Sequence, residues 1–169
     1  MKVRSAVSAT ALFALVLWGA TICAPLLRAQ ETSHPSIPAL TDESLKQMLE
    51  NMGYEPKKLS KGYLLAIKRG TWTVNMQVVL SPDQTKLGMN ANLGKVDDPD
   101  SVTAQQWKNL LISNGDIDPS AFYFDKDQKK LYLHRSGDNR AIDPPFLRKQ
   151  IDNFSANVQE TEALWKFTK

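Results

Sequence analysis

The sequence predicts an α+β fold, a two-layer sandwich with an antiparallel five-stranded sheet and helices packed on one face, in the order helix, three strands, helix, two strands, helix. Two observations carry this prediction. Apolar and polar residues alternate with a period of two along residues 63–93, and apolar residues recur at helical spacing in three other segments. Because successive side chains of a strand point to opposite faces, such alternation is typical of a sheet that is covered on one side.

The first half of the domain is expected to hold one helix and three strands. Thr41 is a residue type that caps helix N-termini, and Gly53 is one that ends helices. Strands are expected over residues 59–68, 72–80 and 87–93, with compact turns between them. The apolar residues at helical spacing between Thr41 and Gly53 are Leu45, Met48, Leu49 and Met52.

The second half is expected to hold a helix, a hairpin and a long helix. Trp107 and Leu110 recur at helical spacing within residues 101–113, which predicts the second helix. Alternating residues on either side of residues 125–128 indicate a hairpin that extends the sheet to five strands. Pro144 directly after Asp143 is a typical helix start. An apolar stripe then predicts one helix ending near Trp165: Leu147, Ile151, Phe154, Val158 and Trp165.

The N-terminal segment has the pattern of an export signal. Lys2 and Arg4 precede residues 5–27, which contain no charged side chain, and Ala29 is a small residue at a plausible cleavage point. Residues 1–29 are therefore predicted to be a signal peptide, followed by a linker at 30–39 and the folded domain at 40–169. An uncleaved membrane anchor stays open, since spanning a bilayer takes about 20 residues. The expected location is exported, periplasmic or extracellular, or anchored in the inner membrane by residues 5–27.

Charge and cysteine content exclude several classes of protein. Lys2, Arg4 and Arg28 account for the whole net charge of +3, so residues 30–169 are neutral and favour neither nucleic acid nor acidic lipid as a partner. Contact with a membrane is expected only if the N-terminal segment stays attached. Cys23 is the only cysteine and lies within that segment, so no disulfide is expected in the domain.

The order of elements resembles the type III secretion chaperone-like superfamily, in particular the YbjN-type bacterial domains. The resemblance covers residues 40–165 and is carried by Gly53-Tyr54 after the first helix, the strands at 72–80 and 87–93, the helix around Trp107, and the 124–133 hairpin. It implies binding or chaperoning of proteins, often as a dimer, with no bound cofactor and no enzymatic activity. None of the residues that carry it is a catalytic signature.

Histidine and aspartate residues offer an alternative function. His134 with an aspartate would suit a small periplasmic hydrolase or a metal-dependent enzyme, although no motif supplies a nucleophile or an oriented carboxylate. Two groups of aspartates offer oxygen ligands but lack the spacing of a calcium loop, so capping of turns and helices is the favoured role. These groups are Asp97, Asp98 and Asp100, and Asp116, Asp118, Asp125 and Asp127.

The polar face of the sheet is the favoured binding surface. It is broad and uncharged, whereas solvated sheet faces commonly carry charges; an ordinary solvated face remains the alternative. The expected function is protein or peptide binding, including a second copy of the chain, through this face or through a strand edge. The candidate residues on the face are Thr71, Thr73, Asn75, Gln77, Asn90 and Asn92.

Overall fold

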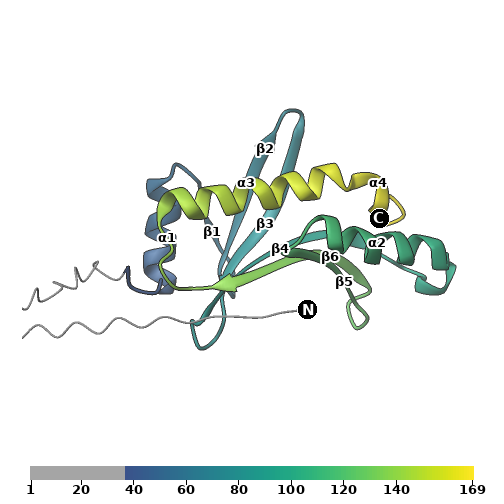
Figure 1. Cartoon of the computed structure of the whole chain (residues 1–169), viewed down its shortest axis with the longest axis horizontal. Helices are drawn as coiled ribbons and strands as arrows, with labels where there is room; N and C mark the ends of the chain where they lie inside the picture. The colour runs from purple at the N-terminus through teal and green to yellow at the C-terminus, as the bar shows by residue number, and fades with distance from the viewer. Residues whose placement is uncertain (1–36) are drawn as a thin grey trace, which may run out of the picture. The chain divides into compact units, whose positions relative to one another are not determined.

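A single antiparallel sheet forms the centre of the molecule (Figure 1). The structure is a computed structural model that describes residues 37–169. The predicted signal peptide or anchor and the predicted linker up to residue 36 lie outside these described residues. The strands lie in the order β1-β2-β3-β4-β6-β5, and every neighbouring pair is antiparallel. Their bounds are β1 Lys57–Lys58, β2 Tyr63–Arg69, β3 Trp72–Leu80, β4 Lys86–Lys95, β5 Ser120–Asp125 and β6 Lys130–Asp138.

Helices lie on one side of the sheet, as predicted. They are α1 Asp42–Asn51, the 3-10 turn η1 Pro99–Ser101, α2 Ala104–Asp116, α3 Pro144–Glu160 and α4 Glu162–Trp165. Thr41 and Thr103 each accept a hydrogen bond from the backbone N–H three residues on, and Asp143 caps α3 in the same way. Among the described residues, no helix is both long and apolar enough to cross a membrane.

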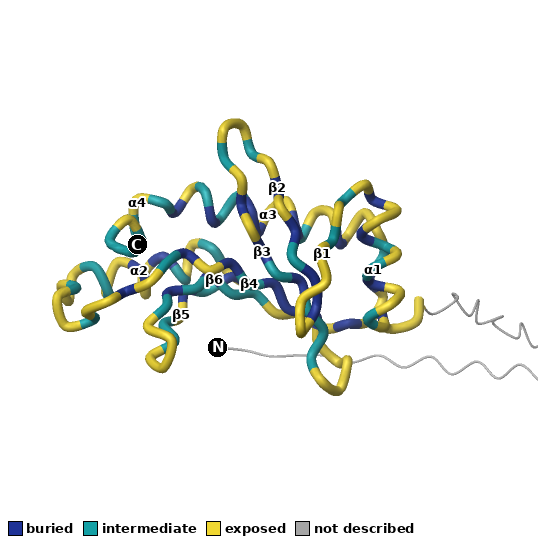
Figure 2. The backbone as a smooth tube through the Cα atoms, turned by 180° about the vertical axis from the view of Figure 1, so that it is seen from behind, coloured by how far each residue is buried: buried dark blue, intermediate teal, exposed yellow. Residues whose placement is uncertain are grey.

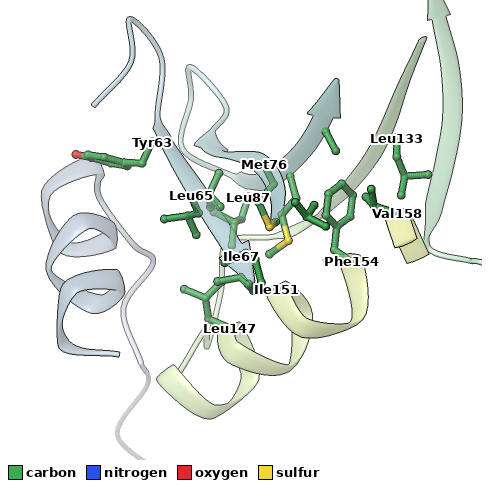
Figure 3. Packing of buried hydrophobic residues seen from close by; sticks show 14 of the residues in the cluster. Tyr63, Leu65, Ile67, Met76, Leu87, Leu133, Leu147, Ile151, Phe154 and Val158 are labelled. Carbon is green, nitrogen blue, oxygen red and sulfur yellow. The ribbon is translucent and has the colours of Figure 1, made fainter. Parts of the chain in front are cut away.

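The core lies between the sheet and α3, the longest helix. Strands turn alternate residues toward α3, and burying each large apolar side chain contributes about 1.5–3 kcal/mol. Figure 2 shows buried segments along β2, β3, β4 and β6, while the tip of the β2–β3 hairpin is exposed. Figure 3 shows the two sets of side chains that meet: Tyr63, Leu65, Ile67 and Met76 from the strands, and Leu147, Ile151, Phe154 and Val158 from α3.

The structure differs from the predicted fold in two details. The sheet has six strands because the two-residue β1 pairs with the start of β2, and two consecutive lysines carry no alternation that would reveal a strand. The long helix ends at Glu160, where the side chain of Thr161 donates to the carbonyl oxygen of Asn157 (2.6 Å). The chain turns there, so Trp165 belongs to the separate short helix α4.

Candidate protein-binding surface

The outer face of the sheet, the face opposite the helices, holds five of the six predicted polar residues, and the sixth, Thr71, lies in the β2–β3 turn. Three of the six already bond within the chain. Gln77 donates to the carbonyl oxygen of Lys61 (2.6 Å), the Oδ1 atom of Asn90 lies 2.6 Å from His134 Nδ1, and Asn92 accepts from the N–H of Gly94 (3.1 Å). The other three are exposed, and their side chains form no hydrogen bond within residues 37–169: Thr71, Thr73 and Asn75.

Two tyrosines, absent from the predicted set, share the outer face at its other end. Tyr123 of β5 and Tyr132 of β6 are paired residues whose rings stack with centroids 5.1 Å apart. The rings of His134 and Tyr123 are nearly perpendicular, and their centroids lie 6.0 Å apart. The sequence contained a signal for this cluster. Tyr132 and His134 lie two residues apart in one predicted strand, so their side chains share a face.

His134 lacks the surroundings of a catalytic base. An amide oxygen only accepts hydrogen bonds, so Nδ1 of His134 donates to Asn90. Burial lowers the pKa of His134, which favours the neutral ring at pH 7. Within residues 37–169 no aspartate forms a hydrogen bond or an ion pair with His134, so the structure does not bring together the pair that the enzymatic alternative needs.

The predicted aspartate groups lie mainly in turns and helix caps. Asp98 caps η1, and Asp125 accepts from the backbone N–H groups of Asp127 and Gln128 in the β5–β6 turn. Asp97 pairs with Lys95 at 2.8 Å, and hydrogen bonding to Lys95 is the main cause that lowers the pKa of Asp97. The described part of the chain contains no cluster of three residues that would hold a metal ion.

One side of β2 is an open strand edge. The N–H of Leu59 donates to the carbonyl oxygen of Gly62 (3.0 Å), and bonded and non-bonded pairs alternate along an antiparallel ladder. Lys57 and Leu64 therefore form the next hydrogen-bonded pair of this ladder. The backbone N–H and C=O groups of Ala66 and Lys68 point in the same direction as those of Leu64, away from β3. Since β1 starts at Lys57, no strand of residues 37–169 lies beside Ala66 and Lys68.

We call residues 65–69 the β2 edge. A groove of about 540 Å³ runs beside it and is lined by both Ala66 and Lys68, by Asn75 of the outer face, and by Tyr54 and Arg148. The guanidinium of Arg148 lies 5.4 Å from the centre of the Tyr54 ring and donates to a backbone carbonyl of α1's C-cap (2.6 Å). Burial is the main cause that raises the pKa of Tyr54 above its usual 10, so its phenol is neutral at pH 7.

Two lysines, Lys57 and Lys58, form β1 beside the start of β2. Lys58 pairs with Asp42 at the start of α1, and its ammonium lies over the Tyr63 ring, 4.4 Å from the centroid. The pairing of β1 with β2 ends at the pair Lys57–Leu64. These contacts hold β1 against the first two residues of β2 and leave the β2 edge uncovered.

The opposite edge strand, β5, is largely closed. The N–H of Ser120 donates to the carbonyl oxygen of Ile117 (2.8 Å), and the N–H of Phe122 donates to the side chain of Asn114 (2.7 Å). Both donors therefore point away from β6 and already have partners. Trp107 of α2 also packs on Phe124, with ring centroids 5.5 Å apart. A further strand would have to displace α2 to pair along β5.

Comparison with known proteins identifies the fold. No protein-family model matches the sequence, and no curated protein matches it. Three solved structures are similar in fold. YbjN from E. coli has 15% identity and a TM-score of 0.54, covering 75% of this chain and 96% of its own. A chain of the HopA1–SchA chaperone–effector complex has 9% identity and a TM-score of 0.51, covering 70% and 90%. A chain of the heterodimeric ExoU–SpcU complex from the type III secretion system of Pseudomonas aeruginosa has 16% identity and a TM-score of 0.51, covering 70% and 94%.

These likenesses confirm that the chain has the type III secretion chaperone-like fold, shared with YbjN. They contradict the predicted exported location, because type III secretion chaperones are cytoplasmic proteins. The export prediction came from the apolar run at residues 5–27, which lies outside the described residues. A run of apolar residues indicates only that the segment favours an apolar environment. It does not identify the compartment of the folded domain.

Proposed function

We propose that this chain is a non-enzymatic, chaperone-like domain that binds a protein or peptide as an added strand along the β2 edge. The observation that carries the proposal is the pair Ala66 and Lys68, whose outward backbone groups have no strand of residues 37–169 beside them. Strand addition supplies affinity through main-chain hydrogen bonds and specificity through alternate side chains. The occurrence of the same fold in a chaperone–effector complex supports a protein as the partner.

Recognition along the β2 edge would use both faces of the added strand. Its side chains would alternate between the groove with Tyr54 and Arg148 and the outer face. On the outer face, Thr73 and Asn75 of β3 are the predicted polar residues that remain available, and Asn75 also lines the groove. We propose that these two, with Thr71 at the hairpin, contact the partner, while Gln77, Asn90 and Asn92 serve internal bonds.

The test is a proline at the edge. In Lys68→Pro the lost N–H points away from β3, so the fold keeps its internal ladder, but an added strand loses a main-chain bond and meets the proline ring. Lys68→Thr is the matched control, because threonine removes the same charge and keeps the N–H. We would use the full chain to capture partners from a lysate of the source cells, identify them, and measure their affinity for each variant.

The expected result is at least about tenfold weaker binding by Lys68→Pro than by Lys68→Thr, since each main-chain bond contributes about 1 kcal/mol and the ring adds a clash. Equal binding by the two variants would refute strand addition at this edge. Failure of the wild-type chain to retain any protein in repeated captures would count against the proposed function as a whole.

A second copy of the chain also fits an open strand edge. Light scattering on the full chain distinguishes the two cases, because pairing of two β2 edges would double the mass in solution. We expect Lys68→Pro to return such a dimer to the monomer mass and Lys68→Thr to leave it intact. A dimer that survives Lys68→Pro would place the contact between copies elsewhere.

A further inference from the structure

A second pocket, of about 310 Å³, lies on the helix side of the sheet, between the end of β6 and the start of α3. We call it the Arg135 pocket. Its apolar part is made by Leu87, Met89, Ile142 and Phe146. Phe146 is 49% exposed although it lies in the first turn of α3, so its ring stands at the rim of the pocket. The pocket therefore offers an apolar surface that a bound side chain would cover.

Arg135 is the polar group that sets this pocket apart. It shares the parity of the buried Leu131 and Leu133, and it pairs with Met89 of β4 and Ser120 of β5, so its side chain starts on the helix side. Arg135 is half-buried, yet it forms no hydrogen bond and no ion pair with any residue of the described 37–169. A guanidinium has five donors, and leaving them unpaired in a partly buried site is unfavourable.

The charges around Arg135 leave it free to act on a ligand. Burial lowers the pKa of Arg135, and the nearby Asp118 opposes this effect without coming within ion-pair distance. Asp138 lines the pocket but is already paired with Lys86 (2.9 Å) and with Arg140 (3.4 Å). The pocket thus combines apolar walls with two guanidinium groups, that of Arg135 without an ion pair within residues 37–169 and that of Arg140 paired with Asp138. No unpaired carboxylate is among its lining residues.

We propose that the Arg135 pocket binds an acidic peptide side chain, with the carboxylate on the guanidinium of Arg135 and a neighbouring apolar side chain against Phe146 and Ile142. Arginine holds a carboxylate through two parallel hydrogen bonds, which gives direction as well as attraction. The inference rests on the proposed role in peptide binding, but it names a site on the other side of the sheet from the outer face.

The test compares two peptides that differ only in charge. Acetyl-Phe-Glu-Leu-amide and acetyl-Phe-Gln-Leu-amide have blocked ends, so glutamate supplies the only charge. Binding to the full chain is followed by the amide resonances of Ser136 and Gly137, which line the pocket. We expect the glutamate peptide to bind at least about tenfold more tightly than the glutamine peptide, the ratio that a charge-assisted hydrogen bond gives. Equal binding, or no shift at these two residues at millimolar peptide, would overturn the proposal.

Two variants separate recognition from folding. Arg135→Met should abolish the preference for glutamate while leaving the melting temperature unchanged or higher, because the guanidinium forms no hydrogen bond or ion pair with residues 37–169 that the substitution would remove. Lys149→Gln is the matched control, since Lys149 is an exposed cation of α3 that does not line the pocket, and it should keep the preference. A retained preference in Arg135→Met, or a marked loss of its stability, would overturn the proposal. Lys68→Pro should leave the preference intact, so failure here is distinguishable from failure at the β2 edge.

Discussion

The two edges of the sheet differ in how their backbone groups are satisfied. At β5, the outward N–H groups of Ser120 and Phe122 bond to Ile117 and Asn114, and α2 packs alongside. At β2, the short β1 covers only Tyr63 and Leu64. An uncovered edge invites pairing with another chain, and natural proteins usually cover or interrupt such edges. One edge here is closed by a helix and the other is left open, which makes the open one the better candidate for a partner.

The largest expected effect comes from loosening the helix that closes β5. Leu110 of α2 is 2% exposed, and Leu110→Ala should lower the free energy of unfolding by about 2–5 kcal/mol through the cavity it leaves. Leu111, its neighbour, is 70% exposed, and Leu111→Ala should change stability by less than about 0.5 kcal/mol. Urea unfolding of both variants measures the difference. Similar values for the two would mean that α2 does not pack on the sheet through Leu110.

A smaller effect is expected from opening β5 itself. Asn114→Ala removes the acceptor for the N–H of Phe122 and should cost about 1–3 kcal/mol, with faster hydrogen exchange at the Phe122 amide. Asn114→Asp keeps an acceptor oxygen at that position and is expected to keep most of the protection. Exchange measured by NMR reports both. Unchanged exchange at Phe122 in Asn114→Ala would show that the edge is closed by other contacts.

The smallest effect concerns the contact that holds β1 against α1. The hydrogen bond from Lys58 is the main cause that lowers the pKa of Asp42 in the folded state below its usual 3.8. A lowered folded pKa stabilises the fold above pH 3.8, and this contribution is lost as the pH falls through the folded value. Asp42→Asn should therefore reduce the melting temperature slightly at pH 7 and much less at pH 2, in thermal melts followed by circular dichroism. An equal reduction at both values would assign the effect to a contact that does not depend on charge, such as the hydrogen bond that Asp42 accepts from the Tyr63 hydroxyl (3.0 Å), rather than to the ion pair.

Local patterns predicted most of the fold. Alternation placed Val74, Met76 and Val78 on the buried face of β3, and helical spacing placed Leu147 and Ile151 in the core. These patterns work because the periods of strands and helices are set by backbone geometry. The two lysines of β1 have no such pattern. The spacing of apolar residues also does not mark the end of α3 at Glu160, where the side chain of Thr161 bonds to the carbonyl oxygen of Asn157.

The candidate sites were less accessible to pattern reading. Parity put Asn75 and Asn90 on one face. Only the structure showed that Asn90 bonds to His134, whereas the side chain of Asn75 forms no hydrogen bond within residues 37–169. Arg135 follows Leu131 and Leu133 in the same parity, so its place on the helix side was readable from the sequence. The sequence did not show that Arg135 forms no hydrogen bond or ion pair within residues 37–169, because this depends on which side chains of other elements come near it.

By itself the sequence determined the α+β class, the order of every element except β1 and α4, and the faces of the longer strands, because these follow from local periodicity. Only the tertiary structure decided which strand edge stays open and which polar side chains are left unpaired. Those properties depend on contacts between different elements, such as Asn114 of α2 with Phe122 of β5 and Asp42 of α1 with Lys58 of β1. Such contacts form when elements pack together, and the periodicity of a single segment does not predict how it packs against another.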